Sequence, residues 1–246
     1  WNFSTEPEPE LGNRRMYWPR GRVLGGSSSI NAMCYIRGQR ADYDGWAAAG
    51  NRGWSWAEVL PYFRRSEDNQ RGADALHGVG GQLSVEDLRH VNPLSLAFLD
   101  AAAAAGHPRN GDFNGAQQVG FGRYQVTQRN GVRCSTAAGY LAEALKRPNL
   151  RVVTHAHATR VLFDRDRAVG IEARVGGRIE RFEASREVLL SGGAINSPQL
   201  LMLSGVGPAD HLRKLDIGVR MDAPGVGRNL TDHLDVCVLR HCKQKI

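Results

Sequence analysis

Residues 21–31 read GRVLGGSSSIN and place two glycines and three serines in the five positions from Gly25 to Ser29. Glycine loses more backbone freedom on folding than any other residue. A run with so little side-chain surface therefore indicates either a plain turn or a place where a ligand comes very close to the main chain. The composition and the other motifs of the sequence bear on that choice.

The chain has 246 residues, of which 41% are hydrophobic and 23% charged, as in ordinary globular proteins. This length suffices for one large domain or two small ones. No apolar run reaches the ~18 residues of a membrane span, and the acidic, proline-rich residues 1–12 do not resemble a signal peptide. We therefore expect a cytoplasmic protein without a transmembrane segment.

The net charge of +7 rests on basic residues that are almost all arginine, 28 against 4 lysines. They are scattered, with no basic run that contains interleaved aromatics, so no nucleic-acid partner is expected. The cysteines form no C-x-x-C pair and fit no zinc pattern, which predicts free thiols in a reducing compartment and no metal site. They are Cys34, Cys134, Cys237 and Cys242.

Caps, prolines and glycines predict helices over residues 55–65, 93–106 and 135–148. In the first helix, Ser55 and Glu58 have the spacing of a capping box, and Pro61 can bend the helix. The second helix has proline at its first position and glycine at its end. The polar, glycine-rich residues 67–92 and 106–122 are predicted to be irregular.

After residue 148 the sequence changes to β-type composition. Short strands are predicted at Leu150–Thr154 and Glu187–Ser191, and the second is apolar enough to be buried. Between them, three runs predict an antiparallel meander, with a two-residue hairpin at Gly176 and Gly177. The runs are ATRVLFD (158–164), AVGIEARV (168–175) and RIERFEA (178–184). The expected fold class is therefore mixed α/β, with helices and a β-meander.

A second glycine cluster follows the last predicted strand. Residues 192–193 are both glycine and break the strand. Asn196 or Ser197 can cap a buried helix that has Pro198 in its first turn, and Gly205 ends that helix. A helix that begins after a glycine turn points its N-terminus at an anion or a nucleotide, although an ordinary strand-to-helix turn has the same pattern.

A third glycine cluster, DAPGVGRNLTDHL, spans residues 222–234. Gly225 and Gly227 bracket a tight loop there, and the polar groups that follow can donate and accept hydrogen bonds. On its own this pattern favours a surface turn.

Five stretches of the sequence, in a fixed order over residues 11–235, resemble the glucose–methanol–choline (GMC) family of flavin oxidoreductases. They are GRVLGGSSSINAMCYIRG (21–38), NGDFNG (110–115), NGVRCST (130–136), SGGAINSPQLLMLSGVGP (191–208) and GVGRNLTDHL (225–234). The first and fourth are similar to the two signatures of the family, and the last resembles the loop that follows the second signature. Within the family, bacterial choline dehydrogenases and the acceptor-dependent dehydrogenases of aliphatic alcohols look most similar.

The resemblance implies that the glycine turn at residues 25–27 lies against FAD, with its backbone N–H groups near the pyrophosphate. Residues 31–34 would then run beside the isoalloxazine ring, and Ala158 would hold the adenine through its backbone. Residues 192–193 would lie near the adenosine, and residues 229–233 near the reactive side of the flavin. The implied FAD-binding residues are Gly25, Gly26, Ser27, Asn31, Ala32, Met33, Cys34, Ala158, Gly192, Gly193, Asn229, Asp232 and His233.

The resemblance also implies a domain plan. Residues 1–66 and 134–246 would form segments of a Rossmann-like FAD-binding domain, and residues 67–133 a substrate-side or lid segment. The G-x-G-x-x-G turn of the family's N-terminal βαβ unit does not occur in this sequence. The family's catalytic histidine is expected beyond Ile246, so no catalytic residue is assigned, and the chain alone is expected to be an inactive central fragment.

The reaction implied for a complete member is the oxidation of a primary alcohol, choline or an aliphatic alcohol, to the aldehyde. Hydride would pass to flavin N5, and the electrons to a quinone-type acceptor or to oxygen. A quinone would allow peripheral contact with the inner face of a membrane. Ile30 stands where some choline oxidases carry a histidine bonded to the flavin, so FAD would be held noncovalently. The alternatives are a non-catalytic fragment, a nucleotide-binding subunit, and a hydroxynitrile-lyase type of flavoprotein without net redox.

Overall fold

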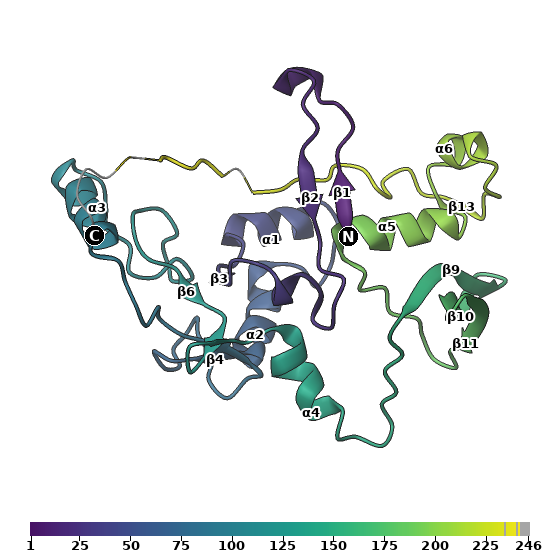
Figure 1. Ribbon diagram of the computed structural model, residues 1–246, viewed down its shortest axis with the longest axis horizontal. Helices are drawn as coiled ribbons and strands as arrows, with labels where there is room; N and C mark the ends of the chain where they lie inside the picture. The colour runs from purple at the N-terminus through teal and green to yellow at the C-terminus, as the bar shows by residue number, and fades with distance from the viewer. Residues whose placement is uncertain (234, 240, 242–246) are drawn as a thin grey trace. The chain divides into compact units, whose positions relative to one another are not determined.

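The structure is a computed structural model that describes residues 1–233, 235–239 and 241 (Figure 1). The chain forms two compact units, Trp1–Arg151 and Val152–Ile246. Both units combine short helices with small sheets, which confirms the mixed α/β class. The assignment of residue ranges to an FAD-binding and a substrate-side domain stays a prediction.

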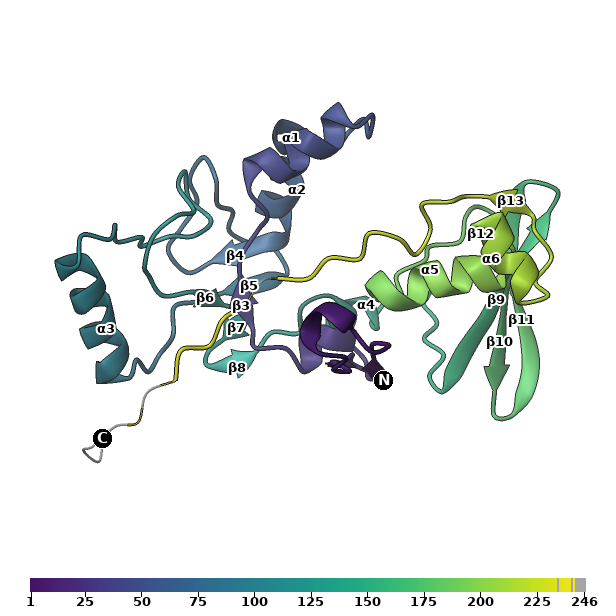
Figure 2. The ribbon, with the colours of Figure 1, turned by 90° about the horizontal axis from the view of Figure 1, so that it is seen from above.

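The first unit contains short two-stranded ladders rather than one continuous sheet. The antiparallel pairs are β1 (Asn2–Ser4) with β2 (Tyr17–Pro19), β3 (Cys34–Tyr35) with β6 (Gln125–Val126), and β7 (Gln128–Arg129) with β8 (Val132–Arg133). The parallel pair is β4 (Glu67–Asn69) with β5 (Leu83–Val85). An isolated bridge from Glu86 to Val126 joins the β5 side to β6, so these ladders lie together (Figure 2). Buried Val85 and Val126 mark this region as a core of the unit.

The helices of the first unit are α1 (Arg40–Ala48), α2 (Trp56–Ser66), α3 (Pro93–Ala104) and the short α4 (Ala142–Ala144). The capping box of α2 is confirmed, because Glu58 Oε2 accepts from the Ser55 N–H at 3.1 Å. Pro61 lies inside that helix. Tyr43 of α1 packs against the rings of Trp56 and Phe63 of α2, with centroid distances of 5.6 and 5.7 Å. These ring contacts bury the facing sides of α1 and α2.

Two predictions in the first unit were partly wrong. Residues 67–92 are not all irregular, since β4 and β5 lie within them. The buried faces of β4 are polar, so no apolar alternation marked it as a strand. The predicted helix over 135–148 is shorter: it consists of a π-helix, η3 (Ala137–Leu141), followed by the three α-helical residues of α4. A Cβ added to Gly139 of η3 would lie 2.7 Å from the Gln82 carbonyl oxygen. This close packing against the backbone favours glycine there.

The second unit contains the predicted meander. The strands β9 (Ala156–Asp164), β10 (Arg167–Val175) and β11 (Arg178–Glu183) form a three-stranded antiparallel sheet in the order β11-β10-β9. Both hairpin glycines have positive φ, 54° at Gly176 and 83° at Gly177, as the tight turn requires. The sheet is visible side on in Figure 1.

The helix α5 (Gly193–Leu203) packs on β9, where the Val161 N–H donates to Ser204 Oγ at 2.8 Å. After it come β12 (Val206–Gly207), α6 (Ala209–Lys214) and β13 (Met221–Asp222), with β12 and β13 parallel. A second small core is formed by residues such as Val161, Ala173 and Leu212.

Three predictions in the second unit were wrong. Leu150–Thr154 and Glu187–Ser191 are not strands, and Leu189 is 77% exposed. A strand needs a hydrogen-bonded neighbour, and neither segment has one among the described residues. The helix α5 begins at Gly193, ahead of the predicted caps, so Pro198 lies inside it. None of its residues is fully buried, because β9 and β12 cover only part of its surface.

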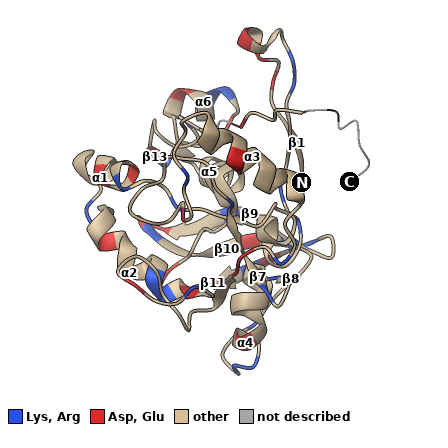
Figure 3. Cartoon of the chain, turned by 90° about the vertical axis from the view of Figure 1, so that its left-hand side faces the viewer, with Lys and Arg blue, Asp and Glu red and all other residues tan. Residues whose placement is uncertain are grey.

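The helices α1, α2 and α6 each carry both basic and acidic residues, whereas α5 has no charged residue (Figure 3). In the described part of the chain, no helix combines the length and the apolar character that crossing a bilayer requires.

Candidate functional site

The glycine turn of residues 25–27 adopts a backbone that favours glycine. Gly25 and Gly26 have φ of 88° and 53°, and the short 3-10 helix η2 (Gly26–Ser29) follows. A Cβ on Gly25 would lie 2.4 Å from Ser29 Oγ, whereas one on Gly26 would meet nothing within 4 Å. The positive φ favours glycine at both positions; a Cβ on Gly25 would also displace the Ser29 hydroxyl, whereas Gly26 faces open space.

This turn presents unused hydrogen-bond donors. The Gly26 N–H donates to the Val23 carbonyl at 2.8 Å and the Ser28 N–H to the Gly25 carbonyl at 3.2 Å. Among the described residues, the N–H groups of Gly25 and Ser27 have no acceptor. Neighbouring N–H groups in a turn with positive φ form a concave site for an anion. The turn is thus suited to a phosphate group, and the role of residues 25–27 toward FAD stays a prediction.

The next stretch, residues 31–34, is held in an unusual backbone. Met33 has φ of 63°, in the left-handed region that non-glycine residues rarely adopt. Its N–H donates to Asn31 Oδ1 at 3.1 Å, and its carbonyl accepts from the Thr127 N–H at 2.9 Å. Cys34 then enters β3 opposite Val126. Asn31, Ala32 and Cys34 remain exposed, so this stretch can contact a ligand.

Behind β3 lies a buried ion pair that the sequence did not reveal. Arg37 Nη2 lies 2.7 Å from Glu67 Oε2, and their side chains are 2% and 0% exposed. The same carboxylate oxygen accepts from the Gly78 N–H at 2.9 Å. Arg37 also donates to the Leu76 carbonyl at 2.7 Å, and its own N–H donates to Asn114 Oδ1 at 2.7 Å. The charges are therefore well satisfied, and they tie the segment after β3 to the strand β4 and to two loops.

His77 extends this cluster toward the surface. Its Nδ1 lies 3.1 Å from Glu67 Oε1, and its Nε2 lies 2.9 Å from Asp112 Oδ2. Asn69 Nδ2 donates to Glu67 Oε1 at 2.9 Å and to Gln125 Oε1 at 3.1 Å, and Gln125 lies on β6 beside β3. The cluster thus fixes both strands of the β3–β6 ladder. Arg37 and Asp112 lie in stretches that resemble the family, but nothing in the sequence pairs them with Glu67 and His77.

Tyr35 of β3 gives a pH-dependent prediction. Burial raises the pKa of its hydroxyl above the ordinary value, while the nearby Arg37 guanidinium acts in the opposite direction. The folded protein then binds this proton more tightly than the unfolded chain does. The corresponding stability is present below about pH 10, the ordinary pKa of tyrosine, and is lost as pH rises through the folded pKa.

We expect the free energy of unfolding of the native protein to fall more steeply above about pH 10 than that of Tyr35→Phe. Urea unfolding across that range, with phenolate absorbance as the second measurement, checks this. Parallel pH curves for the two proteins would contradict it.

In the second unit, Ala158 lies on β9 opposite Ala173 of β10, next to a register shift between Glu172 and Ala173. At the start of α5, the Gly192 N–H donates to Ser197 Oγ at 2.9 Å. Gly193 has φ of 88°, and a Cβ there would meet nothing within 4 Å. Within the described chain the N–H of Gly193 has no acceptor, so this helix end keeps a donor for an anion.

The third glycine cluster forms an exposed turn in the same unit. Asn229 has φ of 55°, and Asp232 Oδ1 accepts from the His233 N–H at 2.9 Å. A Cβ on Gly227 would lie 3.2 Å from Met202 Cε, so the loop passes against α5. The start of α5 and this loop therefore belong to one unit. Whether they and the glycine turn of the first unit share one ligand stays a prediction.

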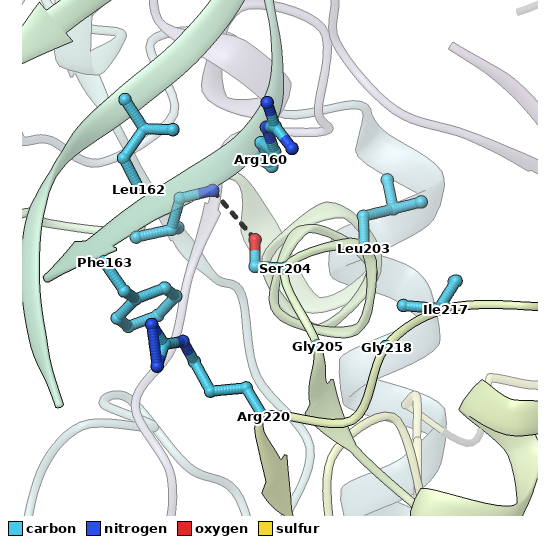
Figure 4. A pocket seen from close by; sticks show the side chains of 10 residues that line it. Arg160, Leu162, Phe163, Leu203, Ser204, Gly205, Ile217, Gly218 and Arg220 are labelled. Carbon is cyan, nitrogen blue, oxygen red and sulfur yellow. Dashed lines mark hydrogen bonds between the residues drawn. The ribbon is translucent and has the colours of Figure 1, made fainter. Parts of the chain in front are cut away.

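A hollow of about 390 Å³ lies elsewhere in the second unit, beside β9 and the end of α5 (Figure 4). Arg220 at its rim places its guanidinium 4.6 Å from the centre of the Phe163 ring and donates to the Arg165 carbonyl. Arg160, which also lines it, bonds to Glu172 and holds the pKa of that carboxyl below its usual range. None of the predicted site residues lines this hollow, so it is not the predicted site.

Comparison with known proteins gives a consistent result. The GMC oxidoreductase family matches residues 8–235. The mitochondrial choline dehydrogenase of Mus musculus is 53% identical over 246 residues, which are 100% of this chain and 41% of that protein. The oxygen-dependent choline dehydrogenase of Brucella ovis is 48% identical over 100% of this chain and 45% of its own length. The chain thus spans less than half the length of these curated relatives.

The fold has a counterpart among solved structures. An FAD-dependent oxidoreductase from Chaetomium thermophilum superposes with a TM-score of 0.85 at 29% identity. The superposition covers 91% of this chain and 41% of that chain.

Proposed function

Because this chain belongs to the GMC oxidoreductase family, we propose that it binds FAD and serves an enzyme that oxidises a primary alcohol, with choline as the first candidate substrate. The observation that carries the proposal is the glycine turn, which lies in the stretch that resembles the first signature of the family. Its Gly25 and Ser27 N–H groups have no acceptor among the described residues. The choline dehydrogenases of mouse and Brucella ovis support the choice of substrate. The FAD-dependent oxidoreductase of Chaetomium thermophilum supports the cofactor.

The residues of the first unit would bind and orient the cofactor. Gly25 and Ser27 would donate their free N–H groups to the pyrophosphate, since a glycine turn without bulky side chains lets the phosphates approach closely. Residues 31–34 would lie along the isoalloxazine ring, held by the left-handed Met33. When bound, FAD supplies the two-electron acceptor for the alcohol.

The residues of the second unit would hold the other parts of the cofactor. Ala158 would contact the adenine through its backbone, and residues 192–193 would lie near the adenosine. Asn229, Asp232 and His233 would lie near the reactive side of the flavin. We assign no catalytic base among these residues, and the inactivity expected for the chain on its own stays a prediction.

FAD would be held without a covalent bond, because Ile30 has no nucleophilic atom. The electron acceptor would be oxygen or a quinone, and the Brucella ovis relative is named for oxygen dependence. Peripheral contact with a membrane stays a prediction tied to the quinone alternative.

Flavin absorbance of the purified protein tests the proposal. We expect the purified chain to bind added FAD and turn yellow. In a protein of the relatives' full length that contains this chain, the visible bands should bleach when choline or a primary aliphatic alcohol is added without oxygen. Acid precipitation should release the flavin into the supernatant, which checks the noncovalent state.

The other outcomes separate the competing functions. Bound flavin that stays oxidised with every alcohol in that full-length protein indicates a flavoprotein of the non-redox, hydroxynitrile-lyase type, whereas the same result with the chain alone fits the expected inactive fragment. A protein that binds no flavin, even with added FAD, contradicts the proposal and favours a non-catalytic or other nucleotide-binding role.

A further inference from the structure

Arg133 of β8 connects the two stretches of the first unit that are predicted to touch FAD. Its Nη1 donates to the Ser28 carbonyl at 3.0 Å and to Asn31 Oδ1 at 2.8 Å. Ser28 belongs to η2 just after the glycine turn, and Asn31 holds the left-handed Met33. One guanidinium nitrogen therefore sets the relative position of the phosphate-facing turn and the flavin-facing stretch.

A second contact from the same segment supports the turn from behind. The Thr136 N–H donates to Ser28 Oγ at 2.9 Å, and Thr136 Oγ1 donates to the Gly25 carbonyl at 3.2 Å. Ser28 Oγ itself donates to that carbonyl at 2.5 Å. These bonds use carbonyl and hydroxyl groups of the turn and leave the Gly25 and Ser27 N–H groups unused. The segment from Arg133 to Thr136 thus holds the turn without occupying its donors.

The charge of Arg133 is not neutralised by an acidic partner. Both of its acceptors are neutral oxygens, and across the described residues no carboxylate forms an ion pair with it. Arg133 is partly buried, so solvent screens this charge less than it screens a fully exposed one. A positive charge hydrogen-bonded to Ser28, the residue after Ser27, adds to the attraction of the turn for an anionic group.

We propose that Arg133 is a positioning residue for FAD. Its guanidinium holds the glycine turn and the Asn31–Met33 turn together as one binding surface. This inference rests on the proposed function. The guanidinium acts through Ser28 and Asn31, so its removal should loosen both turns and let the strained Met33 backbone relax.

The test compares three variants of the purified protein. Arg133→Met removes the guanidinium and keeps an unbranched stem, and Arg133→Lys keeps the positive charge without the planar fork. Arg129→Met is the matched control, because Arg129 is exposed on β7, the partner strand in the same hairpin. FAD dissociation constants, the visible spectrum of the FAD-saturated protein and the melting temperature of the FAD-free protein are measured for each.

We expect Arg133→Met to weaken FAD binding by about 10- to 100-fold, as for the loss of charged hydrogen bonds, and to shift the visible bands of the bound flavin. Arg133→Lys should weaken binding by a smaller factor and shift the same bands, and Arg129→Met should change neither measurement. A lower melting temperature with native affinity and a native flavin spectrum would show a merely structural role and overturn the inference.

The lysine variant decides the matter if Arg133→Met does not fold. Native affinity and a native spectrum in Arg133→Lys then overturn the inference, and a weakened, shifted complex supports it. Absence of flavin binding in the unaltered protein would contradict the proposed function instead, so the two failures are distinguishable.

Discussion

Replacing Glu67 with glutamine should lower the free energy of unfolding by about 3–5 kcal/mol, the loss typical when one partner of a buried ion pair is removed. Glutamine keeps the shape of the side chain, so the effect comes from charge rather than from a cavity. The change leaves the Arg37 guanidinium, 2% exposed, without its carboxylate at 2.7 Å. It also weakens the acceptor for the Gly78 N–H.

Urea unfolding of Glu67→Gln measures this loss, and Asp87→Asn is the control. Asp87 pairs with Arg71 at 2.6 Å, but the side chains of Arg71 and Asp87 are 38% and 45% exposed, so its loss should cost only about 0–1 kcal/mol. Equal effects for the two variants would contradict a buried, charge-based role for Glu67.

Gly21→Ala should destabilise the protein by about 3 kcal/mol and abolish FAD binding, because the added methyl group has no room. A Cβ at this position would lie 2.2 Å from the Gly26 carbonyl oxygen and 2.7 Å from the Ser27 backbone nitrogen. Both are backbone atoms of the glycine turn, so the clash is relieved only by displacing the turn itself. The Gly21 N–H also donates to Ser27 Oγ at 3.1 Å, a bond that this displacement would break.

Gly45→Ala is the control for the added methyl group. Gly45 is exposed in α1, and a Cβ there would meet nothing within 4 Å. Alanine at a helical position should stabilise the protein by about 0.5–1 kcal/mol. FAD titration and urea unfolding follow both variants, and native FAD affinity in Gly21→Ala would contradict the glycine-turn geometry.

Elements that depend on neighbouring residues could be predicted from the sequence. The capping box of α2 joins residues three apart, and the hairpin of β10 and β11 depends on two adjacent glycines. Elements that depend on a distant partner could not. The segment Glu187–Ser191 is apolar, yet it is no strand, because no described strand lies beside it to complete its hydrogen bonds.

Some residues of the candidate site could likewise be predicted from the sequence, and others could not. Gly25 and Gly26 are adjacent in the sequence, and glycine readily adopts a positive φ, so the sequence indicated this turn. The cluster around Glu67 was missed, since its members Arg37, Glu67 and Asp112 lie far apart in the sequence and only folding brings them together. The contribution of Arg133 was missed as well, although its NGVRCST stretch was noted for its resemblance to the family.

The sequence alone determined where the glycine turns lie, where helices are capped and which family the motifs resemble, because these properties depend on residues close together along the chain. Only the tertiary structure decided which distant groups pair, both in the cluster behind β3 and at the glycine turn. Arg37 and Glu67 are 30 positions apart, and Arg133 lies 105 positions from Ser28. Such pairs form only when folding brings distant segments together, and burial then makes their hydrogen bonds strong and their loss costly.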